Sequence, residues 1–168
     1  MERYVFREAE LRDVQTIGRI FDDAVARMLS EGKKQWSETY PREVHALADM
    51  NRHNAYVLEL DGRVVAYGAV IFNGEPAYDN LAGEWLSDGR YVVVHRMAVA
   101  RDAQRQGIAR RFFAAVCNLA NAKGVAAFRI DTNFDNERML GLLDNLGFEY
   151  CGEVVYESGH RMAFEKLL

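Results

Sequence analysis

The sequence predicts a mixed α/β domain in which helices cover both faces of a largely antiparallel sheet of about seven strands. Two observations lead to this fold class. Segments with the apolar pattern of strands and segments with the 3.6-residue period of helices follow one another in the order β-α-α-β-β-β-α-β-α-β-β. Several strands are also consecutive, one pair being joined by a strong hairpin signal, which favours antiparallel pairing.

The N-terminal half is predicted to contain three strands and two helices. Ile17, Phe21 and Ala24 recur at helical spacing and give the first helix one apolar stripe. Pro41 is well placed as the first residue of the second helix, because its missing N–H costs nothing there. Asp61-Gly62 prefers a type I′ turn, so the flanking strands should form a tight hairpin. The expected ranges are a strand at 4–7, helices at 11–30 and 41–51, and strands at 55–60 and 63–72.

The C-terminal half opens with a polar connection at 73–89, and a loop of this length in a compact domain is usually functional or mobile. Gly124 and Gly147 are expected to end the two helices that follow. Ser158-Gly159 should join the last two strands. The expected ranges are a strand at 91–99, a helix ending near 123, a strand at 125–131, a helix from about 136 to 146, and strands at 148–155 and 161–167.

The composition is that of one ordered domain spanning residues 1–168. Hydrophobic residues make up 49% of the chain and charged residues 27%, and only two prolines are present, which argues against a disordered tail. The formal net charge of −4 disfavours broad nucleic-acid binding. Residues 101–111 reverse this sign, because they carry four arginines and one aspartate. The positive charge is therefore concentrated on one short segment.

Cys117 falls within a helix pattern and Cys151 within a strand pattern, so both are expected to be buried reduced thiols. The N-terminal residues lack the apolar run of a signal peptide, and no stretch approaches the roughly 20 apolar residues of a membrane span. The histidines and cysteines show no metal-ligand spacing. We therefore expect a cytoplasmic protein with no membrane, nucleic-acid or metal partner.

The segment from 91 to 124 has the layout of a phosphate-binding site. A strand pattern is followed by Gln104-Arg105-Gln106-Gly107-Ile108-Ala109 and then by an amphipathic helix. The first turn of a helix presents backbone N–H groups with no intrahelical partner, and the positive end of its dipole favours an anion. Gly107 would let the backbone come close to such a ligand. The Gly-Lys-Ser/Thr of a nucleotide-hydrolysing P-loop and the three glycines of a dinucleotide fingerprint are both absent.

The pattern Gln104-x-x-Gly107-x-Ala109 resembles the acyl-CoA-binding motif Q/R-x-x-G-x-G/A of the GNAT superfamily of N-acyltransferases. A second segment, 136–148, reads N-x-x-M-x-x-L-L-x-x-x-G-F and is similar to the family's N-x-x-A-x-x-L-Y-x-x-x-G-F. It departs at Leu143, where many members have a tyrosine that protonates the departing thiolate. The order of elements is also that of the family, so the resemblance covers nearly the whole chain. Residues 35–41, Q-W-x-x-x-Y-P, look like an uncharacterised bacterial group.

The resemblance implies acetyl-CoA as the acyl donor, bound without a metal. Backbone amides at 106–110 would face its pyrophosphate, in a loop shaped by Gln104 and Arg105. The pantetheine arm would pair with the backbone of 97–99, where the fourth and fifth strands splay apart. Asn136 is expected either to hydrogen-bond this arm or to cap the helix that it starts. The implied cofactor-binding residues are Met97, Ala98, Val99, Gln104, Arg105, Gln106, Gly107, Ile108, Ala109, Arg110 and Asn136.

The implied reaction is direct transfer of the acyl group from the thioester to an amine. An alkylammonium with a pKa near ~10.4 must first lose a proton. His95 is the candidate base, because arylalkylamine-type members are similar in carrying a histidine on this strand. Alternation places His95 on the same face as Met97 unless the strand is bulged there, and a hydrogen-bonded core histidine is the alternative. With leucine at 143, the thiolate would be protonated by Tyr150, Cys151 or water.

Trp36 and Tyr40 are expected to line the acceptor pocket, since the family's pocket is usually bordered by the connection between the first two helices. Aromatic walls suit an apolar or cationic amine. Core or dimer packing is the alternative for both residues. Glu84, in the connection at 73–89, could reach the same opening. The acceptor itself is left open, because a small amine, an amino acid, an antibiotic and a protein N-terminus all fit.

Three functional classes follow from these features. An acyl-CoA-dependent N-acetyltransferase is favoured. A catalytically silent acyl-CoA sensor is the alternative suggested by Leu143. The third class is a structural partner that uses the fold only as a scaffold. A homodimer is the default expectation for this resemblance.

Overall fold

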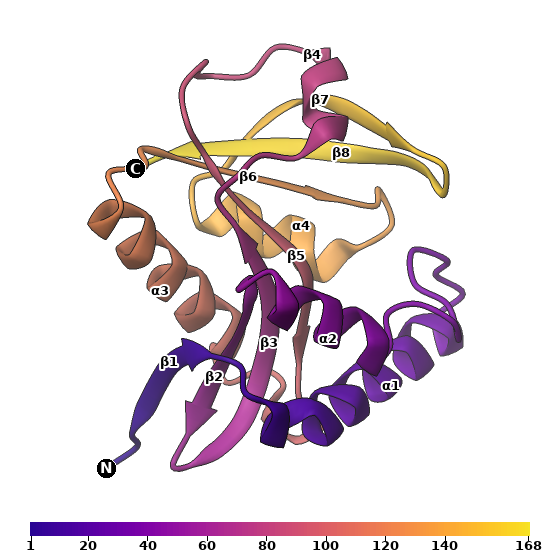
Figure 1. The fold of residues 1–168 in the computed structure, drawn as a ribbon. Helices are drawn as coiled ribbons and strands as arrows, with labels where there is room; N and C mark the ends of the chain where they lie inside the picture. Colours follow the sequence, from indigo (N-terminus) through magenta and orange to yellow (C-terminus); the bar gives the residue numbers. More distant parts are fainter. The chain divides into compact units, whose positions relative to one another are not determined.

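A computed structural model describes the chain from residue 1 to residue 168 and contains eight strands and four α-helices (Figure 1). The strands are β1 (Tyr4–Glu8), β2 (Ala55–Leu60), β3 (Arg63–Ile71), β4 (Ala82–Gly83), β5 (Val92–Val99), β6 (Ala127–Thr132), β7 (Glu149–Tyr156) and β8 (Gly159–Leu167). The helices are α1 (Val14–Ser30), α2 (Glu43–Asn51), α3 (Ile108–Ala122) and α4 (Glu137–Asn145), with short 3₁₀ helices η1 (Leu11–Asp13), η2 (Pro76–Asn80) and η3 (Arg101–Ala103). None of the helices is long and apolar enough to cross a membrane.

The strands follow the order β1-β2-β3-β5-β6-β8-β7-β4 in the sheet. The ladders β1–β2, β2–β3, β4–β7, β6–β8 and β7–β8 are antiparallel, and β5–β6 is parallel. This mixed, largely antiparallel sheet confirms the predicted fold class. The chain divides into two compact units, one made of 1–70 and 95–115 and the other of 71–94 and 116–168.

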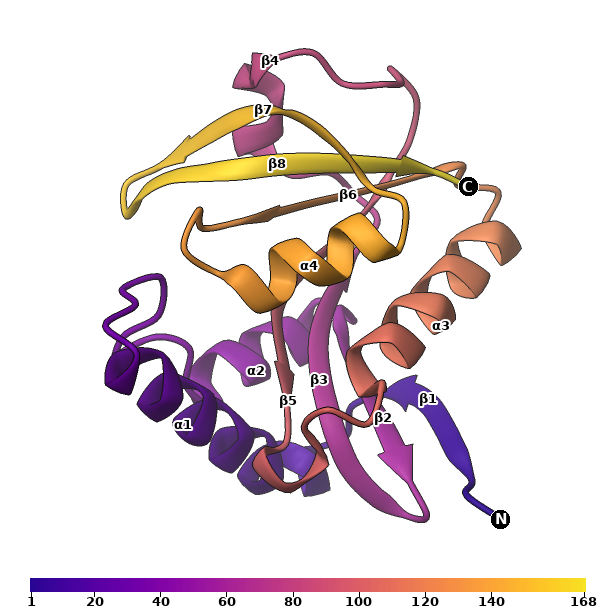
Figure 2. The ribbon, with the colours of Figure 1, turned by 180° about the vertical axis from the view of Figure 1, so that it is seen from behind.

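In the first unit, α1 and α2 cover one face of β2 and β3; they lie in front of these strands in Figure 1 and behind them in Figure 2. Ile17, Phe21 and Ala24 of α1 are buried, as the apolar stripe predicted. Asp61 and Gly62 join β2 to β3 with φ values of 51° and 83°. Two successive left-handed residues are what a type I′ turn requires, so the predicted hairpin is confirmed.

The starts of both N-terminal helices differ from the prediction. The first turn of the range 11–30 is the 3₁₀ helix η1, and α1 begins only after it. The second helix begins at Glu43 and not at Pro41. The reason is a cap further along the chain, where the N–H of Arg42 donates to His45 Nδ1 at 2.9 Å and fixes the first turn there.

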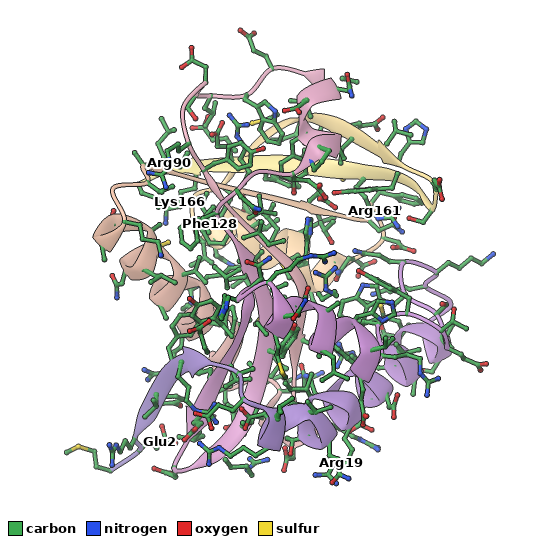
Figure 3. All side chains as sticks on the ribbon, in the orientation of Figure 1. Glu2, Arg19, Arg90, Phe128, Arg161 and Lys166 are labelled. Atoms are coloured by element: carbon green, nitrogen blue, oxygen red, sulfur yellow. The ribbon has the colours of Figure 1, made fainter.

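The second unit contains β4, β6, β7, β8 and α4. Its buried core includes Tyr78, Val93, Val154 and Ala163. β6 and β8 run antiparallel, and their register places Phe128 opposite Lys166; Figure 3 labels this pair toward one end of the two strands. In Figures 1 and 2, α4 lies next to β6, β7 and β8.

The prediction missed β4, which lies inside the polar connection at 73–89 and is the eighth strand. It pairs with β7 through Ala82↔Glu153 and Gly83↔Gly152. The backbones are so close that a Cβ at Gly83 would lie 2.0 Å from the Cys151 carbonyl oxygen. Glycine at this position permits the close contact. A strand of two residues is too short to show the alternation of apolar residues from which strands are predicted.

Candidate functional site

The loop between β5 and α3 contains two left-handed residues separated by one other residue. Arg105 has a φ of 62° and Gly107 a φ of 72°. Such alternation can turn successive backbone N–H groups toward one concave side, which is the geometry of an anion-binding nest. Gln104 holds the start of the loop against the end of β5, since its Nε2 donates to the Val99 carbonyl at 2.8 Å.

α3 begins directly after this loop. The N–H of Arg111 donates to the Gly107 carbonyl at 3.0 Å and closes the first turn. The amides of 108–110 precede this bond and head the helix, where the helix dipole is positive. Arg105 and Arg110 are exposed and add positive charge. A phosphate at this place would meet backbone donors, a helix N-terminus and cations together.

Gly107 is required by its backbone conformation and not by crowding. A Cβ built at this position would meet no atom within 4 Å. Its φ of 72° lies in the left-handed region, which L side chains rarely adopt. The turn itself therefore needs the glycine, before any ligand approaches.

An exposed ion pair ties the start of this loop to β3. Arg63 Nη1 lies 2.9 Å from the carboxylate of Asp102, and this hydrogen bond lowers the pKa of Asp102. A pocket of about 600 Å³ lies beside the pair, between α1, the beginning of β3 and η3. None of the residues that line this pocket was predicted as a site residue, although two of them belong to the basic segment 101–111. Its lining residues are Thr16, Arg19, Ile20, Asp23, Arg63, Val64, Ala100, Arg101 and Asp102.

β5 departs from a regular strand at Arg96, which has a φ of 55°. A left-handed residue inside a strand is typical of a β-bulge, the irregularity that would alter the predicted alternation. The burial pattern shows the same break, since the three residues 92–94 are all buried and the next three, 95–97, are all partly exposed. The facing of His95 therefore cannot be derived from simple alternation.

The Arg96 side chain enters a polar cluster between α2 and the strands. Its Nε and Nη2 donate to the two carboxylate oxygens of Asp49 at 2.9 and 2.7 Å, and its Nη1 donates to the Tyr40 hydroxyl at 3.0 Å. Tyr67 donates its hydroxyl to the same carboxylate. Burial opposes the charge on Arg96 and is the largest single effect, but the hydrogen bonds and charges of Asp49 and Tyr40 together outweigh it and raise the pKa of Arg96. Burial, reinforced by Asp49, raises the pKa of Tyr67.

The predicted acceptor residues of the first unit have different surroundings. Trp36 is 8% exposed and packs edge to face against Phe21, with ring centroids 6.3 Å apart. These are the contacts of a packing residue, the alternative that the sequence left open. Tyr40 is half-buried, and its ring meets the His45 ring with centroids 4.7 Å apart. His95 is half-buried on β5, directly before Arg96.

The predicted site residues of the second unit make hydrogen bonds within that unit. Asn136 Oδ1 accepts the N–H of Met139 at 3.3 Å and so caps α4. Glu84 is exposed, and its N–H donates to the Cys151 carbonyl at 3.0 Å. Leu143 is fully buried, so the position that carries a tyrosine in many GNAT members here belongs to the core.

The two side chains suggested as proton donors also differ in exposure. Tyr150 is largely exposed, whereas Cys151 is buried. Burial, together with the negative charge of Glu165, raises the pKa of the Cys151 thiol. Cys151 is buried as predicted, whereas Cys117 on α3 is only partly buried, contrary to the prediction.

A cluster of two carboxylates and two tyrosines in the second unit was not predicted as a group. Asp131 Oδ2 accepts the hydroxyls of Tyr78 at 2.7 Å and Tyr156 at 2.8 Å, and Tyr156 also lies 3.3 Å from Glu75 Oε1. Burial and Asp131 raise the pKa of both tyrosines, so both hydroxyls stay protonated. The four residues of this cluster come from separate segments of the chain, so no local sequence motif predicts that they lie together.

Comparison with known proteins identifies the family. The model of the acetyltransferase (GNAT) family matches residues 21–148. A GNAT-family acetyltransferase from Streptococcus agalactiae is 31% identical, with a TM-score of 0.89 over 98% of this chain and 95% of that chain. One from Listeria monocytogenes is 19% identical, with a TM-score of 0.77 over 98% and 95%. A Salmonella typhimurium protein whose structure contains its cofactor acetyl-CoA is 16% identical, with a TM-score of 0.69 over 98% and 94%.

A search of curated proteins returned no match.

The first unit brings together the loop at 104–110, the end of β5 and His95, while Asn136 and Glu84 belong to the second unit. The strand, loop and helix start stand in the order of the acyl-CoA motif, and the family model extends over most of the chain. The chain therefore belongs to the GNAT acetyltransferase family and is an acyl-CoA-dependent N-acetyltransferase.

Proposed function

We propose that the protein transfers an acetyl group from acetyl-CoA to an amine by direct attack, and that its pyrophosphate-binding element is the loop at 104–110. The observation that carries this proposal is the pair of left-handed residues, Arg105 and Gly107, directly before the start of α3. They turn the loop where the motif expects a phosphate, and the net charge of the exposed side chains there is positive. Gln104 and Arg105 shape the loop, and the backbone amides of 106–110 bind the pyrophosphate of acetyl-CoA.

The rest of the donor substrate is assigned by the same resemblance. The main chain of 97–99 would pair with the pantetheine arm, as an added strand does. Asn136 already caps α4 through its Oδ1, which leaves its amide nitrogen as the group that could donate to the arm.

The reaction forms a C–N bond and breaks the C–S bond of the thioester. The amine nitrogen needs a free lone pair, so the ammonium must lose a proton, and we assign this step to His95, directly or through water. The thiolate leaves and takes up a proton. Because Leu143 is buried and apolar, that proton comes from water or from the exposed Tyr150. A thiol pKa of about 8.5 makes thiolate a tolerable leaving group without a dedicated acid.

The acceptor is a small-molecule amine or a peptide amine. Tyr40 offers an aromatic face that is half-buried, and Glu84 offers an exposed carboxylate that would favour a cation. Trp36 belongs to the same unit as Tyr40 and supports that unit by packing against Phe21. A silent acyl-CoA sensor is the second candidate, favoured by one observation, the leucine at 143.

Binding and turnover separate these functions. Acetyl-CoA should raise the melting temperature of the wild-type protein and give a calorimetric heat of binding, because it binds the native state. Free thiol release should then appear with at least one amine of a panel. Binding without turnover on any amine would support the sensor, and the absence of binding would reject both functions.

Gly107→Glu tests the loop itself, and the chain offers a matched control. Gly32 has a φ of 73° and open space around its Cβ, as Gly107 has at 72°. Gly32→Glu therefore carries the same backbone strain and the same added charge, away from the loop. We expect Gly107→Glu to lose acetyl-CoA binding and Gly32→Glu to keep it. Equal binding by the two variants would contradict the assignment of the loop.

A further inference from the structure

Arg96 holds an unfavourable backbone conformation in the middle of β5. Its φ of 55° places Cβ close to the neighbouring carbonyl, and arginine is not one of the residues that enter this region readily. No turn or glycine accompanies it, because the residues on both sides belong to the same strand, Val92–Val99. A conformation of this kind persists only when surrounding interactions fix it.

The fixing interaction is a two-point ion pair with α2. The guanidinium meets both oxygens of Asp49 in a fork, at 2.9 and 2.7 Å, and the Asp49 side chain is only 3% exposed. A fork sets direction as well as distance, so it also sets the rotation of the residue that carries it. Neither charge can leave its partner without remaining buried alone. The pair therefore locks the left-handed residue to a helix.

The locked residue lies between two proposed functional groups. His95, the proposed base, precedes Arg96, and the main chain of 97–99, the proposed pantetheine contact, follows it. A bulge re-aims the side chains and the backbone on either side of it. The remaining guanidinium nitrogen, Nη1, donates a hydrogen bond to the Tyr40 hydroxyl. The Arg96 side chain therefore also holds Tyr40, which we propose contacts the acceptor amine.

We propose that Asp49 and Arg96 are positioning residues, whose ion pair holds the bulge of β5 so that His95 meets the amine and residues 97–99 meet the acyl-CoA arm. This inference rests on the proposed function. Neither side chain has to touch a substrate. What the reaction requires is the left-handed backbone at position 96, and in this chain the ion pair is the means of keeping it.

Two double variants separate the backbone conformation from the ion pair. D49N/R96G and D49N/R96V both remove the pair, and the asparagine avoids leaving a buried carboxylate alone. Glycine accepts the left-handed region freely, whereas β-branched valine resists it. With acetyl-CoA and an accepted amine, R96V in this background should lose on the order of 10²-fold in kcat/KM, with weaker acetyl-CoA binding. R96G in the same background should stay within several-fold of wild type.

Each outcome decides the question. Equal kcat/KM and equal acetyl-CoA affinity in the two folded double variants would overturn the positioning role, whatever their melting temperatures. If the valine variant does not fold, Arg96→Lys replaces it, since lysine keeps the charge but loses the fork; unchanged kinetics in Arg96→Lys would likewise overturn the proposal. Wild-type protein that binds no acetyl-CoA would instead reject the proposed function, so the two failures are distinguishable.

Discussion

Glu165→Gln should destabilise the second unit strongly, because it leaves a buried cation without its counter-ion. Glu165 is fully buried, and its Oε2 accepts a hydrogen bond from Arg129 Nε at 3.0 Å. The guanidinium also lies over the rings of Trp85 and Tyr91, with its central carbon 4.2 and 4.1 Å from their centroids. The same carboxylate accepts the N–H and the hydroxyl of Ser87. One side chain therefore joins β8, β6 and the connection at 84–91.

The magnitude follows from burial. Glutamine keeps an acceptor for the backbone N–H groups but removes the charge, and breaking a buried pair by changing one partner costs about 3–5 kcal/mol. A domain of this size shifts its melting temperature by about 2–4 °C per kcal/mol, so the midpoint should fall by about 6–20 °C. The cost is a large fraction of a total stability of about 5–15 kcal/mol.

Denaturant unfolding of Glu165→Gln, Arg129→Met and the double variant would measure this coupling. The double variant should lose less than the sum of the single changes, since neither charge then stands alone. Arg63→Met is the control, because its ion pair with Asp102 has a similar distance of 2.9 Å, but its side chains are 53% and 71% exposed. It should leave the midpoint unchanged. A loss of less than about 1 kcal/mol in Glu165→Gln would refute the reasoning.

Three further predictions concern the site. His95→Gln should lose on the order of 10²–10⁴-fold in kcat/KM yet keep acetyl-CoA binding, whereas the exposed His53→Gln should change neither kcat/KM nor binding. Tyr40→Ala should raise the amine KM more than Tyr40→Phe does, if the ring and not the hydroxyl meets the acceptor. Asn136→Ala should cost about 1 kcal/mol as a lost helix cap, while Asn136→Ser should keep stability and still weaken acetyl-CoA binding; unchanged affinity in the serine variant would limit Asn136 to the cap.

The sequence predicted the features that depend on neighbouring residues. Asp61-Gly62 is a local signal, and its left-handed φ values were expected from the two residue types alone. The loop around Gly107 is local in the same sense, because six consecutive residues carry the motif and the helix pattern begins inside it. Helix starts were less certain, since the cap at Arg42 depends on the orientation of the His45 ring.

The features that the sequence did not reveal depend on residues far apart in the chain. Asp49 and Arg96 are separated by 47 positions, and Arg129 and Glu165 by 36. The pattern around a charged residue does not predict which distant charge it will pair with. The residue type arginine does not predict a left-handed backbone conformation. A bulge in this strand could be expected from the family resemblance, but the ion pair that holds Arg96 could not.

The buried ion pairs of this chain hold segments in which the backbone leaves regular structure. Three ion pairs have a carboxylate less than a tenth exposed: Arg7–Asp13, Asp49–Arg96 and Arg129–Glu165. The first holds η1 at the entry to α1, the second the bulge of β5, and the third the connection at 84–91. Regular helices and strands satisfy their own backbone groups and need only apolar contacts, whereas irregular segments need directed bonds. A relative 31% identical can therefore share the fold with a TM-score of 0.89, because the apolar pattern suffices for it. We expect the shape of the proposed site to depend instead on a specific pair, Asp49–Arg96.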